Sequence, residues 1–289
     1  MLTRRDLLKT LGGATALATR SSDLLAAAHL AWEKPIGLEA YTVRDLFAKD
    51  PAGTLKQVAA IGYNEIEFNP TIEPGLMNSY LRGAGLTAPS AYLDPPKSLD
   101  DWKKIVERAK YFGVHYAVIG DNPRLDSEAW KRRADLYNQC GNVANDAGLQ
   151  FCYHAHYNEY ASTDGTSGDD ILLTHCDPKL VNMEMDIFWA VYAGVDPLQY
   201  WQRYPGRFPL LHIKDLYKDV AVNPDEDPSP GGPNPFAPVG KGKIDWARIF
   251  AHVGKAGTKH IFVEQDFCNM PPLEAIKISF HFVKNLHLG

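Results

Sequence analysis

The chain has 289 residues, of which 45% are hydrophobic and 22% are charged, and its formal net charge is -5. Such a composition belongs to a globular protein with a large core, built either as one large α/β barrel or as two ordinary domains. Acidic residues outnumber basic ones, whereas nucleic-acid-binding proteins usually have an excess of basic residues. No apolar run is long enough to predict a membrane span.

The N-terminal segment carries paired arginines, Arg4 and Arg5, then a small and mildly apolar stretch, then three alanines at 26–28. This order predicts a twin-arginine export signal and a periplasmic location. An arginine and an aspartate interrupt the apolar stretch, so a basic N-terminal helix on a cytoplasmic protein stays open. We therefore expect two regions, a signal or N-terminal extension at 1–30 and a folded domain at 35–289.

From residue 35 onward, apolar runs typical of buried strands alternate with amphipathic stretches typical of helices. The first helix has clear end signals, with Asp50 as cap, Pro51 as first helical residue and Gly62 as stop. The expected strands are residues 35–43, 64–68, 86–92, 114–120, 149–154, 180–187, 208–214 and 260–264. The expected helices are residues 50–61, 73–84, 98–112, 127–147, 169–175, 196–204, 244–255 and 272–286.

Strict alternation of strands and helices implies parallel strands, because each return to the sheet needs a crossover helix. Eight such units predict a single (β/α)8 TIM barrel. An open doubly wound sheet would want a glycine-rich turn after the first strand, and residues 41–45 offer none. The long segment at 221–243, rich in Pro, Gly and Asp, is either a lid over the active site or a plain surface insertion.

The four cysteines are scattered without CxxC spacing, which excludes a zinc knuckle and a dense disulfide framework. We expect free thiols in the core. The residues are Cys140, Cys152, Cys176 and Cys268.

Polar residues gather at the C-terminal ends of the expected strands, where a TIM barrel keeps its active site. Residues two apart on a strand point to the same side, so pairs of them project into one barrel mouth. Buried charges are costly unless they are paired or bind a metal, and mixed oxygen and nitrogen ligands suit Mn, Mg, Co or Zn. The set is Glu39, Tyr41, Glu67, His154, His156, Glu159, Glu184, Asp186, His212, Lys214, Glu264 and Asp266.

Five motifs, four at these strand ends and one just before the helix expected at 244–255, together resemble the sugar phosphate isomerase/epimerase family, which has a xylose isomerase-like TIM barrel. The resemblance covers essentially all of residues 35–289. Relatives in that family include ketose 3-epimerases, inosose dehydratase and 3-dehydroshikimate dehydratase, and endonuclease IV is a distant DNA-cleaving cousin. The motifs span residues 154–159, 182–189, 212–215, 239–245 and 263–266.

The resemblance implies one divalent metal ion, held by a carboxylate, an Asp, a His and a second Glu. Asp186, His212 and Glu264 match the last three positions. On the fifth strand, His154 stands where many relatives have Glu. The fourth ligand is therefore open between His154, His156 and Glu184.

The resemblance also implies that Glu264 is the base on one face of the substrate. Glu159, His156 or Lys214 would have to serve on the other face, because the fifth-strand Glu is absent. The residues expected to bind substrate are Glu39, Tyr41, Glu67, Trp189 and Asp266.

We expect a metal-dependent isomerase or epimerase of a small-molecule carbohydrate, a sugar or cyclic polyol, which moves a proton through an enediolate. The alternative is a lyase or hydratase acting on a keto-sugar or 3-keto-glycoside. A barrel that binds a sugar without catalysis is a third class. Nucleic acid is not an expected partner, and a homo-oligomer is possible in each case.

Overall fold

The part of the chain that the structure covers excludes most of the predicted export signal and much of the predicted loop at 221–243. No helix in the covered part has the length and apolar character needed to cross a bilayer. The structure, a computed structural model, describes residues 29–163, 165–220, 228 and 234–288.

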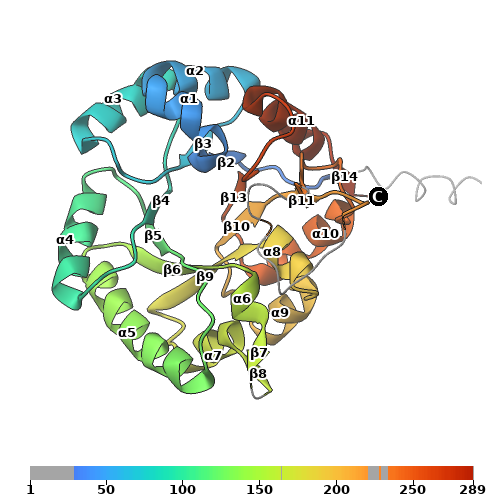
Figure 1. Cartoon of the computed structure of the whole chain (residues 1–289). Helices are drawn as coiled ribbons and strands as arrows, with labels where there is room; N and C mark the ends of the chain where they lie inside the picture. Colours follow the sequence, from blue (N-terminus) through green and yellow to red (C-terminus); the bar gives the residue numbers. More distant parts are fainter. Residues whose placement is uncertain (1–28, 164, 221–227, 229–233, 289) are drawn as a thin grey trace, which may run out of the picture.

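Eight parallel strands form a nearly closed barrel with the helices outside it (Figure 1). All seven ladders between neighbouring strands are parallel. The prediction of a TIM barrel is therefore confirmed. In their order around the barrel the strands are β3 (Glu65–Glu67), β2 (Gly37–Glu39), β13 (His260–Val263), β10 (Leu210–Ile213), β9 (Val181–Asp186), β6 (Gln150–Ala155), β5 (Tyr116–Ile119) and β4 (Ser90–Leu93).

The barrel closes between β3 and β4 through single hydrogen bonds instead of a full ladder. Thr87 O accepts from Ile66 N at 2.9 Å, and Phe68 O accepts from Tyr92 N at 3.0 Å. Pro89 has no N–H to donate, so the regular strand starts only after it. This explains why the strand expected at 86–92 begins late.

Eight helices follow the eight strands, as predicted. Asp50 Oδ1 accepts from Gly53 N at 2.9 Å and so caps the first of them, and Gly62 ends it with φ +125°. The outer helices are α2 (Pro51–Ile61), α3 (Pro74–Ala84), α4 (Leu99–Lys110), α5 (Ser127–Asp146), α7 (Gly168–His175), α9 (Pro197–Arg203), α10 (Trp246–Ala256) and α11 (Pro272–Lys284).

Short helices that the sequence did not predict follow three strands at their C-terminal ends. The strand expected at 35–43 stops early, because the Glu39 side chain accepts from Tyr41 N at 3.3 Å and caps a 3-10 turn. These elements are η1 (Ala40–Val43), α1 (Arg44–Lys49), α6 (Tyr157–Tyr160) and α8 (Ile187–Tyr192).

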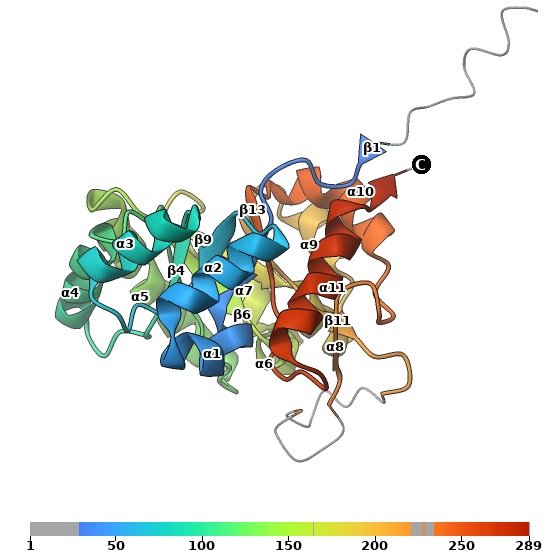
Figure 2. The ribbon, with the colours of Figure 1, turned by 90° about the horizontal axis from the view of Figure 1, so that it is seen from above.

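Three small antiparallel ribbons complete the fold. Figure 2 shows β1 beside the C-terminus at one end of the barrel and α6, α8 and β11 towards the other end. The ribbon of β1 and β14 therefore ties the start of the described part to its end, far from the strand ends that carry the polar residues. The ribbons pair β1 (His29–Leu30) with β14 (His287–Leu288), β7 (Ser162–Thr163) with β8 (Thr166–Ser167), and β11 (Asp215–Leu216) with β12 (Phe236–Ala237).

A layer of buried apolar side chains from four strands forms a core cluster of its own: Val118, Cys152, Leu210 and Phe262. Gly37 makes room for it, since a Cβ there would lie 2.4 Å from the Phe262 ring.

All four cysteines are free, and three are buried. The prediction of free core thiols is confirmed for these three, whereas Cys268 is only partly buried.

Candidate active site

A cavity of about 320 Å³ lies at the C-terminal ends of the barrel strands. Its wall combines carboxylates, imidazoles, one ammonium group and two phenols, and it contains most of the residues that the sequence singled out. The lining residues are Glu39, Tyr41, Asn69, Tyr92, His154, His156, His212, Lys214, Glu264 and Asp266.

His212 is 1% exposed and lies among three carboxylates, those of Glu67, Glu184 and Glu264. Its Nδ1 lies 2.8 Å from Glu264 Oε2, and its Nε2 lies 2.7 Å from Glu67 Oε2 and 3.3 Å from Glu184 Oε2. Burial alone would lower the pKa of His212, but Glu184 and Glu264 outweigh burial and hold it well above the usual value.

His154, on β6, likewise has a carboxylate near each of its ring nitrogens. Its Nδ1 lies 2.9 Å from Glu184 Oε2, and its Nε2 lies 3.8 Å from Asp186 Oδ2. Burial, followed by the positive charge of His212, lowers the pKa of His154 well below its usual value. The imidazole of His154 is therefore neutral at neutral pH.

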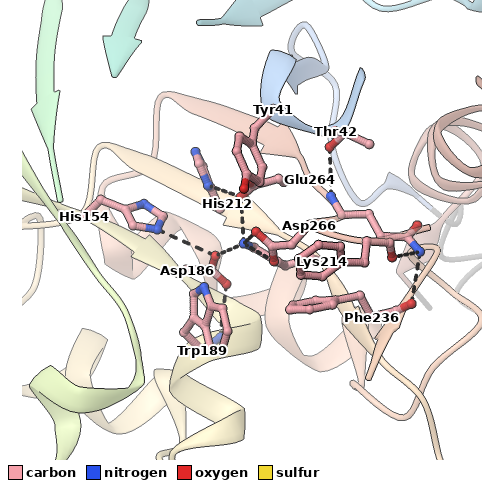
Figure 3. A network of polar contacts seen from close by, with 12 residues as sticks. Tyr41, Thr42, His154, Asp186, Trp189, His212, Lys214, Phe236, Glu264 and Asp266 are labelled. Carbon is pink, nitrogen blue, oxygen red and sulfur yellow. Dashed lines mark hydrogen bonds and ion pairs between the residues drawn. The ribbon is translucent and has the colours of Figure 1, made fainter. Parts of the chain in front are cut away.

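Lys214 is the ammonium group of the cavity, and Figure 3 shows it among three carboxylates. Its Nζ lies 2.7 Å from Glu264 Oε2, 3.0 Å from Asp186 Oδ2 and 3.0 Å from Asp266 Oδ2. Burial would lower the pKa of Lys214, yet these carboxylates raise it well above its usual value. Burial would likewise raise the pKa of Glu264, but Lys214 and His212 lower it. Glu264 is therefore ionised and Lys214 protonated.

The cluster fits a divalent metal ion, because it brings three combinations of imidazole and carboxylate donors within 4.8 Å of one another. His212 belongs to all three. In addition, Glu67 Oε1 and Glu184 Oε1 are buried without a hydrogen-bond partner among the described residues. The combinations are Asp186 with His212 and Glu264, His154 with Glu184 and His212, and Glu39 with Glu67 and His212.

His156 lies in the cavity wall, as the sequence led us to expect, whereas Glu159 does not. Burial lowers the pKa of His156 to about 3. The fully buried Glu159 accepts from the Tyr153 hydroxyl at 2.7 Å and from His156 N at 3.2 Å. Burial raises the pKa of Glu159 to about 8. Glu159 thus lies behind the wall and supports the turn that carries His156.

The expected substrate-binding residues divide into two groups. Glu39, Tyr41 and Asp266 line the cavity, and Tyr41 is 46% exposed at its mouth. Glu67 and Trp189 are buried outside the wall. The Trp189 ring lies 5.3 Å from Lys214 Nζ and 5.6 Å from the His156 ring, so it packs behind both residues.

The sequence reasoning missed two lining residues, Asn69 and Tyr92. Each lies at or just after the C-terminal end of an expected strand, so the same strand-end rule would have found them had it included uncharged residues. The Tyr92 ring meets the His154 ring edge to face, with centroids 5.5 Å apart.

Asp215, next to Lys214, fixes the C-terminal part of the segment 221–243, which the sequence left open as a lid or a plain surface insertion. Its carboxylate accepts from the backbone N–H groups of Leu216, Gly240, Gly242 and Ile244 and from Trp246 Nε1, at 2.8–3.1 Å. Residues 221–227 and 229–233 lie outside the described part, so both the lid and the plain surface insertion remain predictions.

The family model described as a xylose isomerase-like TIM barrel matches residues 55–286. The chain belongs to this family. Inosose dehydratase from Lacticaseibacillus casei is 30% identical over 165 residues, which cover 55% of this chain and 55% of that protein. The chain thus spans about half the length of the curated relatives that it matches.

Solved structures below 25% identity share the fold. A sugar phosphate isomerase/epimerase from Parabacteroides distasonis is 24% identical with a TM-score of 0.73, covering 89% of this chain and 94% of that one. The IOLI protein with a bound zinc atom has 14% identity, a TM-score of 0.64 and coverages of 86% and 96%. A Mycobacterium smegmatis barrel in complex with magnesium has 16% identity, a TM-score of 0.64 and coverages of 88% and 97%.

Proposed function

We propose that this protein is a divalent-metal-dependent lyase that removes water or an alcohol from a keto-sugar or a cyclic keto-polyol. Curated relatives named inosose dehydratase support this choice. We therefore prefer the lyase, which was the alternative in the sequence analysis, to the isomerase or epimerase that the sequence first favoured.

The observation that carries the proposal is the contact between Glu264 and Lys214, whose charged atoms lie 2.7 Å apart in the cavity. Elimination needs a base at the carbon next to a carbonyl and a proton donor at the departing oxygen. An ionised carboxylate beside an ammonium group provides both on one wall. Elsewhere in the wall, β6 contributes His154, and His156 follows it directly; both are neutral imidazoles.

The side chains divide the work as follows. Glu264 accepts the proton from the carbon next to the carbonyl, and the electron pair of that C–H bond forms the new C=C bond as the C–O bond to the leaving group breaks. Lys214 gives a proton to the departing oxygen. The proton on Glu264 then returns to Lys214 across their 2.7 Å contact, which restores both groups.

A divalent ion held by Asp186, His212 and Glu264 would polarise the substrate carbonyl and acidify the neighbouring C–H group. His154 is the candidate for a fourth ligand. Its imidazole is neutral, and its Nε2 faces Asp186 at 3.8 Å.

The test uses the full chain loaded with Mn²⁺, Co²⁺ or Zn²⁺ in deuterated water, with a keto-inositol and a 3-keto-glycoside as substrates. We expect loss of water from the first or of the aglycone from the second, and no loss with Glu264→Gln. Deuterium incorporation with an inverted centre and no leaving-group loss would instead establish the isomerase or epimerase.

That second candidate keeps one specific support, the His156 imidazole, which lines the same cavity as Glu264. A proton removed by Glu264 on one face would have to be replaced from the His156 side on the other. In that case His156→Ala abolishes epimerisation but leaves solvent exchange by Glu264 intact.

We also propose that the protein is exported by the twin-arginine route. The support is the pair Arg4 and Arg5 together with the alanines at 26–28, directly before β1. Replacing both arginines with lysine should keep the full chain in the cytoplasm of a bacterial host, whereas the unchanged chain reaches the periplasm. Equal distribution of the two chains would refute export by this route.

A further inference from the structure

Two carboxylates lie directly behind two histidines of the cavity. Glu67 and Glu184 are both 0% exposed, and neither lines the cavity. Glu67 Oε2 lies 2.7 Å from His212 Nε2, and Glu184 Oε2 lies 2.9 Å from His154 Nδ1. A substrate in the cavity therefore meets the histidines and not the carboxylates behind them.

The second nitrogen of each imidazole faces the carboxylates that match the expected metal ligands. His212 Nδ1 lies 2.8 Å from Glu264 Oε2, and His154 Nε2 lies 3.8 Å from Asp186 Oδ2. The two rings are tilted against each other, with centroids 4.5 Å apart and an interplanar angle of 57°.

A neutral imidazole has one N–H group and one lone pair, and the partner of one nitrogen decides which nitrogen carries the proton. A carboxylate only accepts, so a nitrogen that faces a carboxylate outside the metal shell keeps its hydrogen. The other nitrogen then offers its lone pair to the metal, and the carboxylate also makes that nitrogen a stronger ligand. Both nitrogens of His212 face a carboxylate, Glu67 at Nε2 and Glu264 at Nδ1, so a metal bound to Glu264 would displace the hydrogen from Nδ1 and leave the one on Nε2.

We propose that Glu67 and Glu184 are positioning residues that fix the tautomers of His212 and His154. His212 then binds the metal through Nδ1 and His154 binds it through Nε2. The inference rests on the metal dependence of the proposed function. It makes His154 the fourth ligand and assigns Glu67 a role other than the substrate contact expected from the sequence.

One competing arrangement uses the same atoms. A metal between Glu39, Glu67 and His212 would take Nε2 of His212 and make Glu67 a direct ligand. The two arrangements place the proton of His212 on different nitrogens, so the tautomer of a metal-loaded protein distinguishes them.

The barrel contains a matched control. Glu65 precedes Glu67 by two residues on β3, and its Oε2 lies 2.9 Å from His260 Nδ1. This carboxylate–imidazole pair has the same chemistry but lies at the N-terminal ends of the strands, away from the cavity. Glu65→Gln therefore reports what the loss of such a pair does to the fold alone.

The first measurement is the affinity of the full chain for Zn²⁺ and Co²⁺, determined without substrate by competition with a chelating dye. We expect Glu67→Gln and Glu184→Gln to bind each metal about 10 to 100 times more weakly than the unchanged chain. Glu65→Gln should bind with unchanged affinity. Unchanged affinity in both Glu67→Gln and Glu184→Gln, or an equal loss in Glu65→Gln, would overturn the proposal.

The second measurement needs no folded variant at those two carboxylates. Long-range ¹H–¹⁵N spectra of the zinc-loaded chain, labelled in histidine, identify the protonated nitrogen of each ring. We expect the hydrogen of His212 on Nε2 and that of His154 on Nδ1. A hydrogen on Nδ1 of His212, or failure of the chain to bind zinc at all, would refute the assignment.

The two proposals fail in different ways. Tautomers and affinities as expected, without elimination from either substrate, would leave the positioning roles intact and refute the lyase. Elimination by a chain whose metal affinity is insensitive to both glutamates would do the reverse.

Discussion

Lys214 Nζ and Glu264 Oε2 lie 2.7 Å apart in a site where both side chains are almost fully buried. Asp186, Asp266 and Glu264 together raise the pKa of the lysine. Lys214 and His212 lower the pKa of Glu264, so each group enters the reaction in the charge state that elimination requires. Asp186 and Asp266 hold the same ammonium at 3.0 Å and keep it from leaving the pair.

The first prediction concerns Lys214 as the proton donor. Lys214→Met should lower kcat for elimination by about 10²- to 10⁴-fold, the usual contribution of a positioned acid or base. The loss should shrink as the leaving group becomes more acidic, because such a group departs without a proton. A series of keto-glycosides with aglycones of graded acidity measures this dependence.

Lys214→Arg is the matched control, because it keeps the positive charge but cannot release a proton at working pH. If the role of Lys214 is proton donation, the arginine variant is as slow as the methionine variant with poor leaving groups. Full activity of the arginine variant would show that only the positive charge matters, and it would contradict proton donation by Lys214.

The second prediction concerns metal removal. Stripping the metal with a chelator should abolish activity. Restoring the metal should raise the thermal midpoint, because a ligand that binds only the folded state stabilises it by about 2.7 kcal/mol at 100 times its Kd. Asp186→Ala should lose both effects. If the unchanged chain binds sugar but neither its activity nor its thermal midpoint responds to metal, the protein is a sugar-binding barrel without catalysis.

The alternation of strands and helices was enough to predict the barrel, because each element carried its own pattern and end signals. The strand-end rule also placed His154, His212 and Glu264 correctly in one cavity. It could not tell which polar side chains reach the wall. Glu159 follows β6 in a helical turn, where the two-residue alternation of a strand no longer applies.

The sequence also did not reveal how deep along the barrel axis each inward-pointing side chain lies. Glu67 and Glu184 point inward as the alternation predicts, yet they end beneath the histidines instead of in the cavity. Whether an inward side chain lies in the wall or behind it depends on the stagger between strands, which pairing across the whole barrel sets.

The third prediction is a pH dependence of stability that does not involve the site. Asp169, on α7, is 1% exposed, and neither carboxylate oxygen has a hydrogen-bond partner among the described residues. Burial, and then Asp170, raises its pKa to about 8, against the opposing charges of Arg203 and Arg207. Folding therefore favours the protonated form.

Because the folded pKa of Asp169 exceeds its unfolded value near 4, its contribution is fully present below about pH 4 and is lost as pH rises to about 8. The loss is at most about 1.4 kcal/mol per pH unit. Asp169→Asn cannot ionise, so its free energy of unfolding in urea should fall less between pH 5 and pH 9 than that of the unchanged chain. Parallel pH profiles of the two proteins would refute this reading.

The fourth prediction concerns Gly120, which directly follows β5. A Cβ at this position would lie 2.3 Å from the Tyr92 hydroxyl oxygen and 2.7 Å from His154 O, so the cavity wall must shift to admit even one methyl group. Gly120→Ala should destabilise the protein by about 1–3 kcal/mol and lower kcat/KM, because overpacking displaces Tyr92 and the strand that carries His154.

Gly83, inside α3, is the control for Gly120, because a methyl group added there would meet nothing within 4 Å. Gly83→Ala should therefore raise stability by up to about 1 kcal/mol and leave activity unchanged. Urea unfolding and steady-state kinetics on both variants measure the contrast. Equal effects of the two alanines would show that the wall at Gly120 is not tightly packed.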